Sequence, residues 1–315
     1  MKRALILSGG GSRGSFQVGV WKYLQEKNWS PDMICGSSIG AINAVAIGSG
    51  MTVEQMTNIW TRSVSGRQKI YKLQLLDFMA NALIRRRWIP LMDTTPLKNM
   101  LQSSIDFKKL KRSRTEIIIS AVNINTAAPE FFTQNEITID HLMASSAMPI
   151  IFSPHKIDGI LYWDGGIMAN IPLLPALIKE MEEIIVVLLS PVGHEMRLPE
   201  PKRLMDAGEH LMEQSLVSSY QNTLMGQIIG DSKSRINAIL PDSSYLRRTN
   251  IKNLAKNIEQ NNADEKQEHK LPKIITIAPS KMLGIPSLLN FTLKQANALM
   301  ADGYQNAYNQ LKDIV

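Results

Sequence analysis

A serine lies at the centre of a Gly-x-Ser-x-Gly pattern, GSSIG, at residues 36–40. A mostly apolar segment precedes the pattern and a run of small residues follows it, which predicts a strand, a sharp turn and a helix. Such a turn exposes the Oγ of Ser38 above the sheet, and Gly36 and Gly40 leave the room that the turn needs. The helix directs its first amides and the positive end of its dipole at the same point. The pattern predicts a serine nucleophile; the alternative is a plain turn with a helix-capping serine.

A serine hydroxyl needs a neighbouring base, because its own pKa keeps it protonated at neutral pH. Asp164 is the strongest candidate, since it ends an apolar segment and is followed by Gly165 and Gly166, which allow a sharp turn and a close approach. A carboxylate in a site with little water can have a raised pKa and act as a base. The alternative is an Asp-Gly turn with a solvated carboxylate. Among the five histidines, His155 is the candidate for a Ser-His-Asp triad.

The first apolar segment, 4–7, runs into the glycine-rich sequence GGGSRG at 9–14. Gly9, Gly11 and Gly14 match the G-x-G-x-x-G pattern of a dinucleotide-binding turn, so a nucleotide-binding oxidoreductase is one hypothesis. That hypothesis expects an acidic residue at the end of the second strand to bind the ribose. The second strand ends instead in the nucleophile pattern, and the oxidoreductase is therefore the alternative.

The same glycine-rich loop predicts an oxyanion hole. Acyl transfer places negative charge on a carbonyl oxygen, and fixed backbone amides stabilise that charge by a few kcal/mol per donor. Gly10 and Gly11 carry no side chains and present their amides from the end of the first strand; their neighbours Gly9, Arg13 and Gly14 complete the predicted loop. Two roles are open for the Arg13 side chain, which either supports the loop or binds the anionic head of a substrate.

The elements that must position these residues follow from the apolar segments. Most of these segments are near-continuous apolar runs, as expected for strands of a sheet that is covered on both faces. Helical patterns lie between several of them, so we predict an α/β fold, a three-layer α/β/α arrangement with a mostly parallel central sheet. The predicted strands are 4–7, 32–36, 116–122, 129–133, 160–164, 183–189 and 273–278, and the helices after the first two are 15–28 and 41–50.

Two stretches, about 54–114 and 200–270, stand apart from this pattern. The first is helical in pattern and basic, whereas the second is polar and ends in a charged tract. Because the strand at 273–278 returns to the sheet, we interpret 1–315 as a single catalytic domain with two helical insertions. The basic residues at 84–88 and 107–114 predict peripheral contact with an anionic membrane, each charge contributing about 1 kcal/mol. The alternative is a solvated helix face.

Composition bounds the remaining classes of function. Of the 315 residues, 44% are hydrophobic and 20% charged, which excludes a disordered chain, and the net charge of +7 favours anionic partners. The sequence contains no recognised nucleic-acid-binding motif beside this charge, so nucleic acid is not an expected partner. Cys35 is the single cysteine, so an intrachain disulfide is excluded. The sequence shows no cluster of His, Cys or carboxylate residues that would bind a metal, and no cofactor is expected.

The N-terminal apolar run ends after four residues, whereas a secretory signal needs about 7–15, so no signal peptide is expected. No run approaches the roughly 20 apolar residues of a transmembrane helix. These observations leave three locations open: cytoplasmic, peripheral on a membrane, or exported without a cleaved signal. The oligomeric state is not predicted.

Three motifs in order, GGGSRG at 9–14, GSSIG at 36–40 and DGG at 164–166, resemble those of the patatin-like phospholipase family. The sequences ASSAMPIIFSP at 144–154 and NIP at 170–172 are similar to that family as well. The resemblance spans about residues 1–190, and the region from 273 onwards is similar to bacterial members. It implies a phospholipase or lipid esterase that hydrolyses a lipid or acyl-ester substrate without a cofactor, through a Ser–Asp dyad. Ser38 would be the nucleophile, Asp164 the general base, and the amides around Gly10 and Gly11 the oxyanion hole. A non-catalytic membrane-binding scaffold of the same fold is the further alternative.

Overall fold

The computed structural model describes residues 1–62, 70–74, 77, 79, 81, 89–191, 200–202, 206–207, 210–211, 213–216, 218, 272–284 and 286–314. Within these residues, an eight-stranded sheet has the order β10-β9-β1-β2-β5-β8-β7, and β6 pairs with the other edge of β5. The strands of this sheet are β1 (Arg3–Leu7), β2 (Met33–Ser37), β5 (Glu116–Asn123), β6 (Ala128–Thr133), β7 (His155–Ile157), β8 (Ile160–Asp164), β9 (Glu183–Val187) and β10 (Lys273–Ile277). The small strands β3 (Lys72–Leu73) and β4 (Met92–Asp93) form a separate two-stranded sheet.

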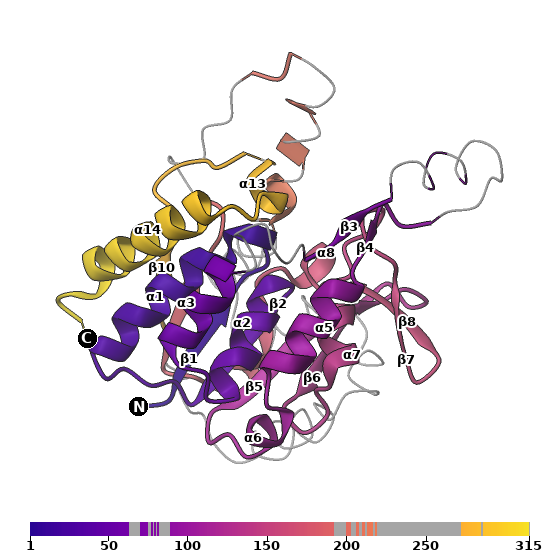
Figure 1. Cartoon of the computed structure of the whole chain (residues 1–315). Coiled ribbons are helices and arrows are strands. Elements are labelled where there is room, and N and C mark those ends of the chain that lie inside the picture. The colour runs from indigo at the N-terminus through magenta and orange to yellow at the C-terminus, as the bar shows by residue number, and fades with distance from the viewer. Residues whose placement is uncertain are drawn as a thin grey trace.

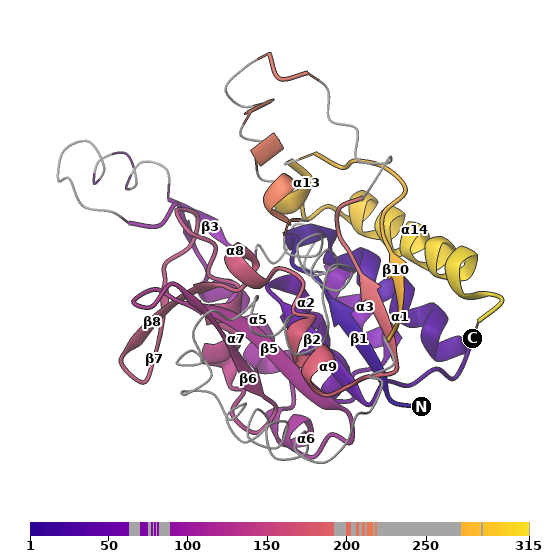
Figure 2. The same cartoon turned by 180° about the vertical axis from the view of Figure 1, so that it is seen from behind.

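The helices cover the large sheet on both faces (Figures 1 and 2). They are η1 (Gly11–Gly14), α1 (Ser15–Glu26), α2 (Ile39–Gly48), α3 (Val53–Arg62), α5 (Thr95–Ser104), α6 (Phe107–Lys111), α7 (Ile139–Ser145), α8 (Gly166–Ala169), α9 (Leu174–Ile178), α13 (Pro286–Leu289) and α14 (Leu293–Leu311). Alternate residues of a strand point to opposite faces. In β1, Leu5 and Leu7 pack into the core cluster that includes α1, α2 and α14, whereas Ala4 and Ile6 pack with the cluster that includes α9.

The predicted three-layer α/β fold with a mostly parallel sheet is confirmed. The pairs β10–β9, β9–β1, β1–β2 and β2–β5 are parallel, and β6, β7 and β8 pair in the antiparallel sense. All seven predicted strands are present, with ends shifted by up to two residues. The prediction missed β7, because its sequence HKI has one apolar residue in three and so gives no apolar run.

The sequence predicts a helical stretch at 54–114, but its described residues also contain two strands: β3 and β4 lie between α3 and α5 in the chain, and α6 follows α5. The prediction missed these two strands because each has only two residues. The basic residues at 84–88 lie outside the described residues, as does most of 200–270. Among the residues that are described, no helix combines the length and the apolar character needed to cross a membrane.

Candidate active site

Two strands of the sheet end at the same point on β5. At the end of β2, Ser37 pairs with Ser120, and at the end of the antiparallel β8, Asp164 pairs with Ala121. Ser120 and Ala121 are consecutive, and β6 occupies the other edge of β5, so β2 and β8 meet end to end along one edge. The register therefore brings Ser38, the next residue after β2, beside Asp164 although they are 126 residues apart in the chain.

Ser38 occupies a strained turn between β2 and α2. Its backbone angles are φ 53° and ψ −123°, in a region that residues with side chains rarely adopt. A Cβ at Gly36 would lie 2.3 Å from the carbonyl oxygen of Gly40, and a Cβ at Gly40 would lie 2.2 Å from that of Leu7. The amide of Ser38 donates a hydrogen bond to Oγ of Ser145 at 3.0 Å. Both glycines of the pattern are thus required by close packing, and this packing holds the serine in its turn.

The side chains of Ser38 and Asp164 are hydrogen-bonded to each other. Oγ of Ser38 donates to Oδ2 of Asp164 at 2.6 Å, and the amide of Gly166 donates to Oδ1 at 2.7 Å. Asp164 is 3% exposed, and this burial raises its pKa to about 6 against the opposing effect of the two hydrogen bonds. A Cβ at Gly165 would lie 2.4 Å from the carbonyl oxygen of Ser120, so the turn after Asp164 needs a glycine. A carboxylate of this pKa is suited to accept a proton near neutral pH.

The glycine-rich loop lies against the nucleophile turn. A Cβ at Gly9 would lie 3.0 Å from Cβ of Ser38 and 2.4 Å from Oδ1 of Asn170, so only glycine fits there. The amide of Gly9 donates to the carbonyl oxygen of Asn170. The amides of Gly10 and Gly11 have no acceptor among the residues that the structure describes. Gly11 lines the same pocket as Ser38, so a residue with an unpaired amide donor belongs to the wall of that pocket.

Two side chains that the sequence analysis missed join this loop to the helices. Nδ2 of Asn43 in α2 donates to the carbonyl oxygen of Gly14 at 3.0 Å and to Oε1 of Gln17 at 2.8 Å. Nε2 of Gln17 donates in turn to the carbonyl oxygen of Ser8 at 2.8 Å. A Cβ at Gly14 would lie 2.5 Å from Cγ1 of Ile39, the residue after Ser38. These contacts connect both ends of the loop to α1 and α2.

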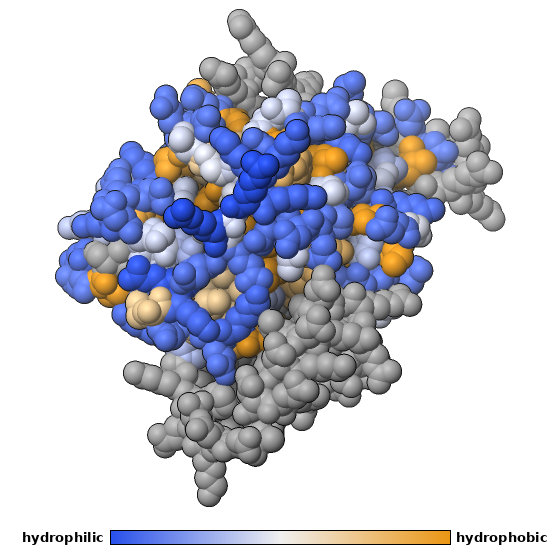
Figure 3. All heavy atoms as spheres, turned by 90° about the horizontal axis from the view of Figure 1, so that it is seen from below, coloured by the Kyte–Doolittle hydropathy of each residue, from blue (hydrophilic) through white to orange (hydrophobic). Residues whose placement is uncertain are grey.

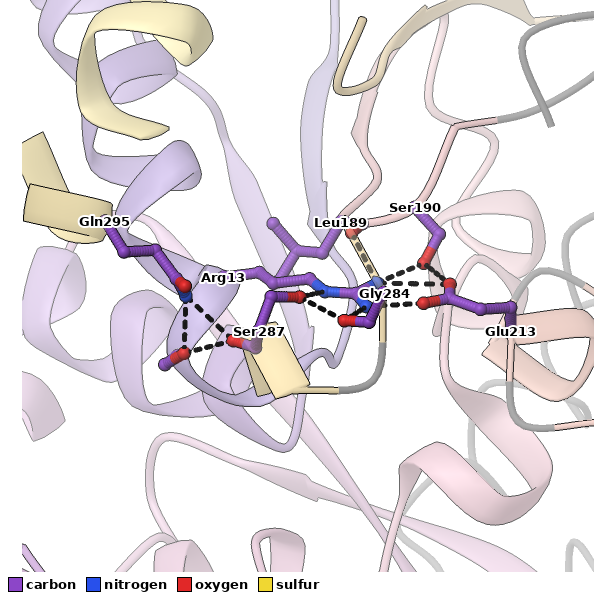
Figure 4. A network of polar contacts seen from close by, with 8 residues as sticks. Arg13, Leu189, Ser190, Glu213, Gly284, Ser287 and Gln295 are labelled. Atoms are coloured by element: carbon purple, nitrogen blue, oxygen red, sulfur yellow. Dashed lines mark hydrogen bonds and ion pairs between the residues drawn. The ribbon is translucent and has the colours of Figure 1, made fainter. Parts of the chain in front are cut away.

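The Arg13 side chain is fully buried, and its contacts correspond to support of the loop rather than to binding of a substrate head (Figure 4). Each of its three nitrogens donates to protein acceptors. Nε donates to Oγ of Ser287 at 2.7 Å; Nη1 donates to Oγ of Ser190, the carbonyl oxygen of Leu189 and Oε2 of Glu213; and Nη2 donates to Oε1 of Glu213 and the carbonyl oxygen of Gly284. Glu213 is likewise fully buried and also accepts from Ser190. No guanidinium nitrogen is left for a substrate.

A second set of contacts fixes the same loop to the C-terminal part of the chain. Oγ of Ser12 donates to the carbonyl oxygen of Ser287, and Nε2 of Gln295 donates to both of these oxygens at 2.8 Å (Figure 4). The sequence analysis did not identify Ser145, Asn170 or Glu213 as parts of the site. Ser145 and Asn170 lie in the sequences ASSAMPIIFSP and NIP that resemble the family, but those sequences do not indicate their contacts with Ser38 and Gly9; Glu213 lies in no such pattern.

The histidines described by the structure have partners other than Ser38. Nε2 of His155 lies 2.9 Å from Oδ1 of Asp140, which also pairs with Lys98 at 2.9 Å. His141 caps the start of α7 with Thr138, and burial lowers the pKa of its imidazole. The predicted base Asp164, not His155, is the hydrogen-bond acceptor for the serine.

The remaining candidates for chemistry can be placed as well. His194 and His269 lie outside the described residues. Cys35 is buried in β2, and that burial raises the pKa of its thiol, so it is not a reactive group. Within the described part of the chain, no group of three or more His, Cys, Asp or Glu residues could hold a metal ion.

An apolar pocket extends from Ser38 and Asp164 between α2, α3 and α5. Its wall is formed mainly by aliphatic, methionine and aromatic side chains. Those from the helices are Ile39, Ile42, Ala46, Met56, Ile59, Trp60, Leu97, Met100, Leu101, Leu288 and Leu289. Ser38 and Asp164 thus line a space whose apolar wall suits a hydrocarbon chain.

Comparisons with known proteins identify the family of this chain. The sequence profile of the family described as patatin-like phospholipase matches residues 5–177, more than half of the chain. A cGAMP-activated phospholipase of Vibrio cholerae is 28% identical over 201 residues, which cover 54% of this chain and 55% of that protein. A cGAMP-activated phospholipase of Escherichia coli is 25% identical over 207 residues, 58% of this chain and 56% of that protein. The chain therefore spans about half the length of these relatives.

Among solved structures, VipD from Legionella pneumophila superposes with a TM-score of 0.48 at 15% sequence identity. The superposition covers 99% of this chain and 67% of VipD.

Proposed function

Because the chain belongs to the patatin-like phospholipase family, we propose that it is a lipid acyl hydrolase that uses Ser38 as its nucleophile and Asp164 as its general base. The observation that carries this proposal is the 2.6 Å hydrogen bond between these two side chains, which line an apolar pocket. The relatives that are named phospholipases support the same class of reaction.

In the proposed mechanism, the ester carbonyl carbon of the substrate lies beside Oγ of Ser38. Oγ attacks this carbon while Asp164 accepts the hydroxyl proton, and the carbonyl oxygen becomes negatively charged. The unpaired amides of Gly10 and Gly11 are the donors for this oxyanion, and such donors contribute about 3 kcal/mol each. When the tetrahedral species collapses, the ester bond breaks and Asp164 passes the proton to the leaving alcohol.

The resulting acyl-enzyme is hydrolysed by water. Asp164 accepts a proton from the water molecule that attacks the acyl carbonyl, and it returns this proton to Ser38 as the carboxylic acid leaves. Asp164 must be ionised to start either step, and its pKa of about 6 leaves it ionised at neutral pH. Arg13 takes no part in the proton transfers; we assign it to holding the glycine-rich loop in place.

The nucleotide-binding oxidoreductase is not favoured. The loop at 9–14 lies against the serine turn, and Gly9 is packed against both Ser38 and Asn170. A phosphate bound by the amides of Gly10 and Gly11 would compete with a substrate carbonyl for the same donors. The scaffold alternative gives no account of a serine held in a strained turn with its hydroxyl bonded to a carboxylate of raised pKa.

We further propose that 1–315 forms one catalytic domain, with insertions at about 54–114 and 200–270, and that it contacts anionic membranes peripherally. The described cations of this surface are Lys108, Lys109, Lys111, Arg112 and Arg114, and all are exposed. They lie on and after α6, which precedes the first residue of β5 and is at the end of the sheet away from Ser38 (Figure 1). The face seen from below is mainly hydrophilic over its described residues (Figure 3). Sedimentation with anionic and zwitterionic vesicles tests this contact, and equal binding to both would contradict it.

Hydrolysis of a panel of phospholipids, neutral lipids and simple esters tests the proposed activity. The wild type releases free fatty acid from at least one lipid class, and Ser38→Ala releases none. Release at the same rate by the Ser38→Ala protein would show that another group is the nucleophile. No release from any ester by the wild type would favour the scaffold.

A further inference from the structure

A second pocket lies at the far end of α2 from Ser38. It is bounded by the residues that follow α2 and by the connection between α5 and α6, including Ser49, Gly50, Asp106 and Lys109. We call it the distal pocket. The distal pocket adjoins the apolar pocket that Ser38 and Asp164 line, because three residues line both and form the wall between them: Met51, Ile59 and Ser104.

The apolar pocket follows one face of α2 from the nucleophile towards this wall. Ile39, Ile42 and Ala46 all line it, and their spacing of three and four residues places them on one side of the helix. Helix α2 has ten residues, so it advances by about 15 Å. The apolar pocket therefore begins at Ser38 and reaches the distal pocket over roughly the length of α2.

The wall between the two pockets consists of side chains from separate elements. Met51 follows α2, Ile59 lies on α3 and Ser104 ends α5, and all three are partly exposed. Methionine is unbranched and has three rotatable side-chain bonds, so Met51 can change rotamer without a backbone movement. An acyl chain in the apolar pocket thus meets the movable side chain of Met51 at the end of the pocket away from Ser38.

We infer that the distal pocket binds the far end of long acyl chains. This role rests on the proposed acyl hydrolase activity. An extended chain advances about 1.2 Å per bond, by analogy with the extended polypeptide, so the length of α2 accommodates about twelve carbons. Acyl chains longer than this pass Met51 and end in the distal pocket. Shorter chains end in the apolar pocket.

The polarity of the two pockets predicts how activity varies with chain length. Each methylene buried in the apolar pocket adds to binding. The distal pocket is lined by Gln55, Asn58, Asp106 and Lys109, so methylenes beyond the wall remain beside polar groups and gain little. We therefore expect kcat/KM to rise up to about twelve carbons and then to stay level, whereas a closed apolar pocket would give a steep fall.

The test is a series of esters with straight acyl chains of six, twelve and eighteen carbons. In the wild type, kcat/KM for the eighteen-carbon ester stays close to that for the twelve-carbon ester. Met51→Trp fills the passage, so an eighteen-carbon chain no longer fits without displacing about two of its methylenes from the apolar pocket, and the ratio of eighteen-carbon to six-carbon kcat/KM falls about tenfold. Ser104→Phe narrows the same passage from α5 and lowers the same ratio. Glu54→Trp is the matched control, because Glu54 is exposed on α3 and lines neither pocket; its ratio equals that of the wild type.

The inference is overturned if kcat/KM of the wild type is already much lower for the eighteen-carbon ester than for the twelve-carbon ester. It is also overturned if Met51→Trp and Ser104→Phe keep the wild-type ratio while they hydrolyse the six-carbon ester. Failure of the proposed function has a different signature, since no ester of any length would then depend on Ser38.

Discussion

Asp164 and Glu213 are both buried carboxylates, but Asp164 has neutral partners whereas Glu213 has a cationic one. Asp164 accepts hydrogen bonds from a hydroxyl and a backbone amide, with no cation among its described hydrogen-bond and ion-pair partners. Glu213 faces the guanidinium of Arg13, and neither side chain of this ion pair is exposed. Burial without a cation favours the protonated carboxyl, as the pKa of Asp164 of about 6 indicates. Burial beside a cation instead makes the carboxylate part of the scaffold, because removal of one partner leaves the other charge unpaired.

The difference teaches that the partner, rather than the depth of burial, separates a proton acceptor from a support. Both carboxylates act on the same reaction centre in the proposed mechanism. Asp164 touches the nucleophile, whereas Glu213 reaches the oxyanion loop only through Arg13 (Figure 4). Replacement of each carboxylate by its amide preserves shape and removes charge, so the same change at the two positions tests the comparison directly.

Catalysis shows the largest expected effect. Asp164→Asn removes the proton acceptor and lowers kcat by about 10²–10⁴-fold, the usual contribution of a general base. Glu213→Gln keeps the base, and the activity that remains in its folded fraction is much closer to wild type. Steady-state kinetics on one ester, with circular dichroism to measure the folded fraction, compares the two. Equal losses of kcat in the folded fractions of both variants would contradict the assignment of Asp164 as the proton acceptor and Glu213 as a support.

Stability shows the next effect, with the opposite ranking. Glu213→Gln leaves the buried guanidinium of Arg13 without its counter-charge, so the free energy of unfolding falls by about 3–5 kcal/mol. Urea denaturation at neutral pH measures this change. The double variant Arg13→Met with Glu213→Leu removes both charges and recovers part of the loss. A single variant as stable as the wild type would mean that the ion pair does not hold the loop.

Asp164→Asn is expected to increase stability. The pKa of Asp164 is raised from 3.8 to about 6 by folding, so its ionised form disfavours the native state above that pH. The amide removes this penalty of about 2–3 kcal/mol at neutral pH. The gain is present above about pH 6 and disappears as the pH falls to about 4, where the wild-type carboxyl is protonated as well. Melting temperatures of both proteins across this range measure it; a gain that is independent of pH would contradict the explanation.

The pH profile of catalysis gives the smallest effect. Because Asp164 must be ionised to accept a proton, kcat/KM falls about tenfold for each pH unit below an apparent pKa near 6. The profile is measured on a neutral ester, so that ionisation of the substrate does not contribute. If kcat/KM instead began to fall only near pH 4, burial would not have raised the pKa of the group that acts as the base.

The proposed catalytic pair, Ser38 and Asp164, can be predicted from the sequence because the turns that carry these residues need glycines. Gly36, Gly40 and Gly165 stand where a Cβ would collide with backbone oxygen atoms, so glycines mark the turns that carry Ser38 and Asp164. The strand before Ser38, β2, is buried along its whole length, as expected for a strand of a sheet that is covered on both faces.

The supports of the site cannot be predicted in this way. Glu213 is 200 residues from Arg13, and Ser145 is 107 residues from Ser38, so only the folded chain shows which residues meet. The end-to-end meeting of β2 and β8 depends likewise on the register of both strands against β5. The sequence left two roles open for Arg13, and its buried contacts distinguish between them.

Covalent labelling with a fluorophosphonate, read by peptide mass spectrometry, tests the central claim most directly. The account predicts one adduct, on Oγ of Ser38, in the wild type, no adduct in Ser38→Ala, and strongly slowed labelling in Asp164→Asn. An adduct on any other residue, or equal labelling of the wild type and Ser38→Ala, would contradict the assignment of Ser38 as the nucleophile.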